Sequence, residues 1–242
     1  MVLLIDRFRP ERIWGCQSTF ILKVLDDDYV TMFDMWRPDW ANDNFPAATI
    51  TNRSVQAVSW NGLRGAAAAP SDTIGSNRNG SFFERLNALT GIGGFDLPTE
   101  VMAEIAQRAG ETGVFSWGDE EVDVKDYAIG IENNSHQSST GHHMPVGLGA
   151  PNNWGLFDTS GNCWEFCRDD ASLEDLSDAV DPWTPASGGS ALVRRHGGGH
   201  CRDPLFKSNG NPSNILRASE RYTQGKTKAA WGIGFRVSRI MQ

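Results

Sequence analysis

Two segments of the chain carry apolar residues at helical spacing. In the first, SFFERLNALTG, Ser81 followed by Glu84 is a capping-box pattern, and Gly91 is a typical helix stop. The residues that share one face of this segment are Phe83, Leu86 and Leu89. The pattern therefore predicts a short amphipathic helix.

The second segment, LPTEVMAEIAQRAG, is the clearer helix. Thr99 is a typical N-cap, Glu100 suits the positive end of the helix dipole, and Gly110 is expected to end the helix. The stripe expected to be buried consists of Val101, Met102, Ile105, Ala106 and Ala109.

Alternating and β-branched runs predict short strands elsewhere. STFILKVLDDDYVTMFDMW (18–36) is expected to form two strands with a turn at Asp26–Asp28. Further strands are expected at ALVRR (191–195), ILRASERY (215–222) and GIGFRVSR (232–239). Glycine-rich and polar loops are expected to dominate between these elements. Without an internal repeat or a low-complexity linker, residues 1–242 are expected to form one domain.

Charge and composition exclude several classes of partner. The net charge of −8 disfavours nucleic acid and anionic membranes, which need a basic face. No apolar run approaches the ~20 residues of a membrane span, and the apolar stretch before Asp6 is too short for a signal-peptide core. We therefore expect a cytoplasmic or virion-associated protein. Four cysteines are too few for a disulfide scaffold, although a bridge from Cys163 to Cys167 or Cys201 stays open.

The densest candidate chemistry lies in the stretch PNNWGLFDTSGNCWEFC (151–167), called here the signature stretch. Asp158 and Glu165 flank a glycine turn at Gly161, an arrangement that suits a hard cation such as calcium. Alternatively, the two carboxylates cap turns and pair with a buried arginine. The aromatic residues expected to fill the interior are Trp154, Phe157, Trp164 and Phe166, and Cys163 and Cys167 are expected to pack in the core.

The signature stretch resembles the PNxxGLYDMxGNVWEW motif of the formylglycine-generating enzyme (sulfatase-modifying factor) family. Further motifs appear in the family's order over roughly residues 55–239. They are VSW at 58–60, DLPTEVMAEIAQRAG at 96–110, SWGDE at 116–120, MPVGLGAPN at 144–152, RHGGG at 195–199, LRASER at 216–221 and GFRVSR at 234–239.

The resemblance implies an α+β, C-type-lectin-like fold. Such a fold has a small twisted antiparallel sheet, two main helices and many long loops. The resemblance also implies one structural calcium, held by the side chains of Asp158 and Glu165 and the carbonyls of Gly161 and Cys163. A second family calcium site is not expected, because Ile129 stands where the family has asparagine.

The catalytic thiols of the family do not appear in this chain. The family's enzymes oxidise a substrate cysteine with two copper(I)-binding cysteines, five residues apart. If Cys201 is taken as the first of the two, Phe206 stands at the second position, five residues later. If the positions are instead counted back from Arg217, Ser208 and Ser213 occupy them. We therefore expect no copper and no enzyme activity. His196 and His200 lie near Cys201 in a glycine-rich loop. That these histidines line a surface pocket is a simpler interpretation than a zinc or iron site.

Some members of this lectin-like group are non-catalytic variable proteins of diversity-generating retroelements. Their diversified loops precede the closing GFR-type strand, which corresponds here to 196–231. This region mixes aromatic, cationic and amide side chains, as binding loops do. The predicted ligand-binding residues are His196, His200, Arg202, Phe206, Lys207, Asn209, Asn211, Asn214, Tyr222, Gln224, Lys226, Lys228 and Trp231. The expected partner is a protein or glycan on a cell or virion surface.

Two alternatives remain open. One is a divergent oxidase of the family. The other is a structural virion or surface-layer component whose divergent segment 1–50 contacts neighbouring subunits, so that the protein self-associates.

Overall fold

A computed structural model describes residues 2–4, 58–65, 81–119, 124–133, 144, 146–170, 189–194, 203–229 and 232–240 of the chain. The two strands predicted within 18–36 lie outside these residues, as do most of the segment 1–50 and the residues His196, His200, Cys201, Arg202 and Trp231. Within the described residues, no helix combines the length and the apolar character that crossing a bilayer requires.

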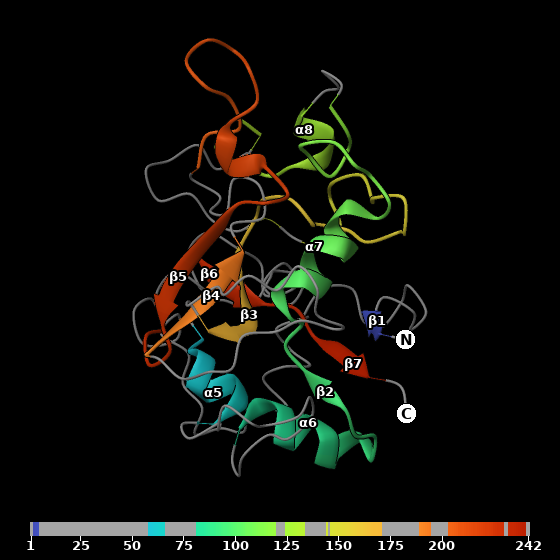
Figure 1. The fold of residues 1–242 in the computed structure, drawn as a ribbon, viewed down its shortest axis with the longest axis vertical. Coiled ribbons are helices and arrows are strands. Elements are labelled where there is room, and N and C mark those ends of the chain that lie inside the picture. Colours follow the sequence, from blue (N-terminus) through green and yellow to red (C-terminus); the bar gives the residue numbers. More distant parts are fainter. Residues whose placement is uncertain are drawn as a thin grey trace, which may run out of the picture.

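The two ends of the chain meet in a small antiparallel sheet. Strand β7 (Ser238–Ile240) lies between β1 (Val2–Leu4) and β2 (Phe95–Asp96). Val2 pairs with Ile240, so the first and last strands are neighbours (Figure 1).

A second sheet of four strands carries most of the fold. Its order is β5 (Arg221–Gly225), β4 (Ser190–Arg194), β3 (Trp164–Asp170) and β6 (Ile233–Phe235). The β3–β4 and β4–β5 pairs are antiparallel, whereas β3 and β6 run parallel. The strand predicted at 232–239 is therefore two strands, β6 and β7, in different sheets.

The strand predicted at 191–195 is confirmed as β4, but the one at 215–222 is wrong. Residues Asn214–Leu216 form a short 3₁₀ helix, η1, and the strand begins only at Arg221. The cause is local: the backbone N–H of Leu216 donates to Ser213, and that of Arg217 donates to Asn214. These bonds turn the chain and bury Leu216 completely.

The two predicted helices exist, and both predicted N-caps are confirmed. In α6 (Phe82–Thr90), the Ser81 hydroxyl accepts the backbone N–H of Glu84, and Gly91 is left-handed with φ of 66°. In α7 (Glu100–Arg108), the Thr99 hydroxyl accepts the N–H of Met102. The predicted stop at Gly110 is one residue off, because the left-handed C-cap is Ala109, with φ of 49° and its N–H donating to the Ile105 carbonyl. Two shorter helices, α5 (Trp60–Arg64) and α8 (Val124–Tyr127), lie at opposite ends of the molecule (Figure 1).

The buried face of α7 differs from the predicted stripe. Ala106 and Ala109 are buried as expected, but the Ile105 side chain is 52% exposed. The helix instead turns Glu100, Ala103 and Gln107 inward. It does so because β3 and the signature stretch offer contacts on that side: Asp169 accepts the Glu100 N–H at 2.7 Å, and Ala103 packs against Cys167.

The main core lies between α5, α6 and the two sheets. Phe82, Phe83 and Phe235 meet edge to face, with ring centroids 5.0–6.1 Å apart. The fully or nearly buried members of this core are Val58, Trp60, Leu63, Phe82, Phe83, Leu86, Phe95, Leu97, Phe166, Ala191, Ile233 and Phe235.

The signature stretch fills the interior only in part. Phe166 is fully buried, whereas Phe157 and Trp164 are half-buried. The prediction for Trp154 is wrong, because its side chain is 57% exposed. The Asn152 side chain accepts the N–H groups of Trp154 and Leu156 and closes a turn there, which places Leu156 inside instead. Cys163 and Cys167 are buried, as expected.

A charged centre lies beneath this apolar core. The Asp96 carboxylate accepts two hydrogen bonds from Arg64, at 2.7 and 3.0 Å, and lies 3.7 Å from Nε of Arg168. All three side chains are at most 1% exposed. The Ser238 hydroxyl also donates to the Asp96 carbonyl. One aspartate therefore links α5, β2, β3 and β7.

We expect Asp96→Asn to lower the free energy of unfolding by about 3–5 kcal/mol, because it leaves buried arginine charge without its carboxylate partner. Urea unfolding followed by tryptophan fluorescence measures the change. The control is Asp126→Asn on α8, where the aspartate is exposed and the loss should stay within about 0.5 kcal/mol. Equal losses in both variants would contradict a special role for Asp96.

Candidate functional site

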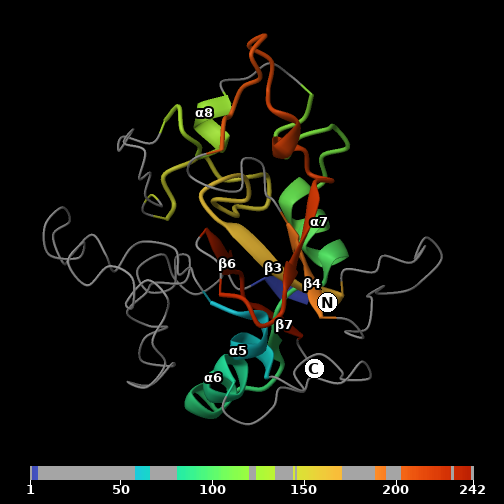
Figure 2. The same ribbon diagram turned by 90° about the vertical axis from the view of Figure 1, so that its left-hand side faces the viewer.

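A hairpin projects from the end of the molecule that carries α8 (Figures 1 and 2). Phe206 and Pro212 pair as an antiparallel bridge at its base. Across the loop, the backbone N–H of Lys207 donates to Asn211 at 2.8 Å, and that of Gly210 donates to Lys207 at 2.9 Å. Gly210 has φ of +84°, which glycine adopts without strain. The tip, residues 207–211, is exposed throughout.

The base of the hairpin rests on a second, smaller core. Leu205 and Leu216 are fully buried there together with Val124 and Ala128. Phe115, Trp117 and Phe206 pack against this group. A compact apolar base therefore holds the polar tip.

Aromatic stacking and one carboxylate reinforce this base. The rings of Phe115 and Trp117 are stacked at 5.0 Å, and Trp117 continues to Tyr127 at 5.7 Å. The Glu132 carboxylate accepts the backbone N–H of Leu205 at 2.8 Å. The sequence alone does not assign any of these residues to the base of the hairpin. The aromatic-rich FSWGD stretch was a possible signal for Phe115 and Trp117, but the residues that they contact become neighbours only in the folded chain.

A second exposed feature is an aromatic side chain on β5. Tyr222 is 41% exposed, and its ring meets Trp164 edge to face at 5.1 Å. The Trp164 indole N–H in turn donates to the carboxylate of Asp203 at 3.3 Å. Asp203 is close in sequence to the hairpin. Gln224 is half-buried two residues further along β5.

The first residue of β5 is held by two carboxylates of α7. Arg221 contacts Glu100 at 2.7 Å and Glu104 at 2.5 Å. Partial burial pulls the pKa of Arg221 down, but the two carboxylates more than offset this and raise that pKa above its ordinary value. The start of β5 is therefore tied to α7, which also packs against β3.

Lys226 does not lie on this surface. Its side chain is buried, with the ammonium 2.9 Å from the Asp170 carboxylate and 4.9 Å from the centre of the Trp60 ring. Its backbone N–H donates to Gly189, and its carbonyl accepts from Asn61 on α5. Lys226 thus joins three segments at the end of the sheet that faces α5.

The predicted ligand-binding residues therefore fall into separate groups. Phe206, Lys207, Asn209 and Asn211 belong to the hairpin, and the exposed Asn214 follows its base. Tyr222 and Gln224 lie on β5. Lys226 and the exposed Lys228 follow the last residue of that strand. The five residues of β5 put them roughly 15 Å from the strand's first residue, Arg221. The described part of 196–231 does not form one continuous face.

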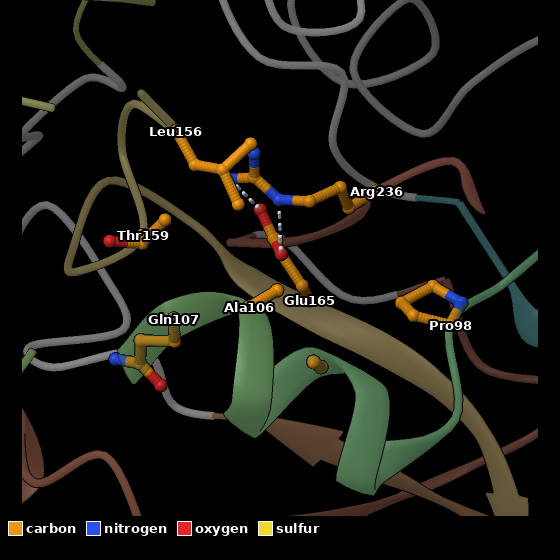
Figure 3. A pocket seen from close by; sticks show the side chains of 8 residues that line it. Pro98, Ala106, Gln107, Leu156, Thr159, Glu165 and Arg236 are labelled. Atoms are coloured by element: carbon orange, nitrogen blue, oxygen red, sulfur yellow. Dashed lines mark hydrogen bonds and ion pairs between the residues drawn. The ribbon is translucent and has the colours of Figure 1, made fainter. Parts of the chain in front are cut away.

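At the predicted metal position, Glu165 of the signature stretch forms an ion pair with Arg236 (Figure 3). Both oxygens of Glu165 accept from Arg236, at 3.1 and 3.2 Å. The same guanidinium donates to the carbonyls of Phe157 and Asp158, each at 3.2 Å. The hollow beside this pair has room for roughly one water molecule.

The other predicted calcium ligands also carry hydrogen bonds. Asp158 accepts the Gly147 N–H at 2.6 Å, and the Gly161 carbonyl accepts the Cys163 N–H at 2.8 Å. The predicted ligand residues Asp158, Gly161 and Glu165 therefore all have contacts within the chain in this structure. The sequence left open a calcium site or a carboxylate paired with an arginine. The contacts of Glu165 are those of the pairing with arginine, and calcium binding itself stays a prediction.

Gly161 has a packing role in this stretch. It is left-handed, with φ of +87°, and pairs with Ile129. A Cβ atom at this position would lie 2.3 Å from the Ile129 carbonyl oxygen, so no other residue fits without moving the backbone.

Comparison with known proteins places the chain in a family. Residues 27–241 match the profile described as "Sulfatase-modifying factor enzyme 1-like domain". The chain belongs to this family. The formylglycine-generating enzyme of Streptomyces coelicolor is 29% identical over 210 residues, which cover 80% of this chain and 64% of that enzyme. The formylglycine-generating enzyme of Thermomonospora curvata is 30% identical over 155 residues, which cover 59% of this chain and 48% of that enzyme. This family member thus spans between about half and two thirds of the length of these relatives.

Solved structures share the fold of this family member. Treponema denticola variable protein 1 superposes with a TM-score of 0.55 at 23% identity, covering 79% of this chain and 72% of that protein. PvdO from Pseudomonas aeruginosa also gives a TM-score of 0.55, at 19% identity with 79% and 63% coverage. CarF gives 0.51 at 17% identity, with 84% and 71% coverage. The predicted α+β, C-type-lectin-like fold is confirmed.

We expect Lys226→Met to destabilise the protein by about 3–5 kcal/mol, because it removes the ammonium group from the buried Asp170 carboxylate. Chemical unfolding of the variant and of Lys228→Met tests this. Lys228 is exposed two residues along, and its substitution should cost no more than about 0.5 kcal/mol. A wild-type unfolding curve for Lys226→Met would show that this lysine is not an anchor.

Proposed function

We propose that this family member is a non-catalytic recognition module, with the 206–212 hairpin and Tyr222 as its ligand-binding surface. The supporting observation is the contrast between the exposed tip of the hairpin and its buried base. Lys207, Asn209 and Asn211 offer a cation and two amides to solvent, whereas Leu205 and Leu216 are fully buried. A preformed loop loses little conformational entropy on binding, which favours affinity.

The chemistry of the surface suits a protein or glycan ligand on a cell or virion. Exposed amide side chains adapt their hydrogen bonds to different partners, and a half-exposed tyrosine supplies a large, stiff contact area. Tyr222 has that character, since Trp164 fixes one edge of its ring. The structural neighbour named as a variable protein is consistent with a loop-based recognition role for this scaffold.

The absence of a thiol pair in the sequence supports a non-catalytic role. Ser208 and Ser213 stand where the family resemblance places the two copper-binding cysteines. Ser208 is exposed at the hairpin tip, and Ser213 is buried at its base. Hydroxyl groups are poor ligands for copper(I), which selects thiolates.

The proposal predicts that the triple variant Lys207→Ala, Asn209→Ala, Asn211→Ala loses at least about tenfold in affinity, equivalent to about 1.4 kcal/mol. Tyr222→Ala should also weaken binding. Probes are a glycan microarray and an array of purified bacterial surface proteins, with affinities for the hits measured by biolayer interferometry.

The matched control is Lys228→Ala, at the other end of β5. It should bind like wild type, and both it and the triple variant should melt within about 2 °C of wild type because the replaced side chains are exposed. Wild-type affinity in both the triple variant and Tyr222→Ala would reject the proposed surface.

The similarity to two formylglycine-generating enzymes favours a divergent oxidase as the second candidate. Titration with copper(I) against a chromophoric chelator distinguishes the two. We expect no stoichiometric high-affinity binding, and no oxidation of a cysteine-containing sulfatase peptide detectable by mass spectrometry. Tight one-to-one copper binding that Cys201→Ser abolishes would instead establish the oxidase.

A further inference from the structure

Arg236 occupies the chain's crossover between its two sheets. It follows the last residue of β6, in the four-stranded sheet, and precedes β7, in the three-stranded sheet. From this position its side chain reaches back to the signature stretch, as Figure 3 shows for Glu165.

The guanidinium group of Arg236 gathers oxygen atoms as a bound cation does. It contacts both Glu165 oxygens and the carbonyls of Phe157 and Asp158, all at 3.1–3.2 Å. Carboxylate and carbonyl oxygens are also the ligands that calcium prefers. Both side chains of the pair are largely shielded, with exposures of 14% for Glu165 and 23% for Arg236.

We propose that the Arg236 guanidinium serves as the cation of this site, so that the signature stretch keeps its conformation without bound calcium. A calcium ion at this site would have to share the Glu165 carboxylate, both of whose oxygens already accept from the guanidinium. The guanidinium is covalently part of the chain and needs no free ion, whereas a metal must be recruited from solution. The inference does not rest on the proposed function, and its test measures no ligand binding.

Thermal melting of the wild-type protein in calcium chloride and in EDTA is the first test. We expect the two melting temperatures to agree within about 1 °C. If the folded protein bound one calcium ion, a free calcium concentration of a hundred times the Kd would raise the melting temperature by roughly 5–10 °C. A calcium-dependent rise of that size in the wild type would overturn the inference, and this measurement needs no variant.

The second test uses Arg236→Gln, which removes the charge and leaves the oxygen set in place. We expect its melting temperature in EDTA to fall by roughly 5 °C or more, because Glu165 loses its partner. Added calcium should then raise it toward the wild-type value. A variant that melts like wild type, or one that is destabilised but ignores calcium, would show that Arg236 is not in a cation's place.

Arg239→Gln is the matched control. Arg239 lies three residues along the same strand region, donates to the Gly93 carbonyl at 3.1 Å and covers the Phe95 ring. It touches none of the proposed site, so calcium should not change its melting temperature. If Arg236→Gln does not fold, Arg236→Lys keeps a single charge without the paired geometry and should show a smaller fall in melting temperature.

Discussion

The buried ion pair between Asp96 and Arg64 is the interaction on which the rest of the fold depends. Water cannot reach either side chain, so any other packing of these elements would leave a charge without a partner. Because the Arg64 donors come from α5 and Arg168 comes from β3, the position of one carboxylate sets the relative placement of both. Such a pair need not add net stability, but it favours one arrangement over its competitors.

Around that centre, the polar contacts form a connected path through the molecule. Trp60, which shares α5 with Arg64, donates its indole N–H to the Cys167 carbonyl on β3. The Lys226 ammonium, just after β5, lies over the Trp60 ring in a cation–π contact. At the opposite end of β5, Arg221 is tied to α7. Both ends of the edge strand are therefore fixed by charged side chains. The hairpin that precedes β5 consequently starts from a rigid frame, which is the physical basis for treating it as a binding element.

The helices and their caps could be predicted from the sequence because they depend on neighbours within four residues. Ser81, Thr99 and Gly91 all act locally, and all three behave as expected. The buried side of α7 could not, since Ile105 is a better core residue than Glu100 by composition alone. Its orientation follows from Asp169 and Arg221, which approach from distant parts of the chain. The same holds for Lys226, whose burial depends on Asp170 and Trp60.

The sequence by itself determined the family, the fold class and the lack of paired thiols near the closing strand, because these follow from residue identities in a fixed order. The tertiary structure decided which of the predicted binding residues face solvent together. It also decided that Glu165 is met by a guanidinium, since Arg236 is 71 residues away in the chain and becomes its neighbour only through the parallel pairing of β3 with β6. Long-range pairing of this kind leaves no trace in local sequence patterns.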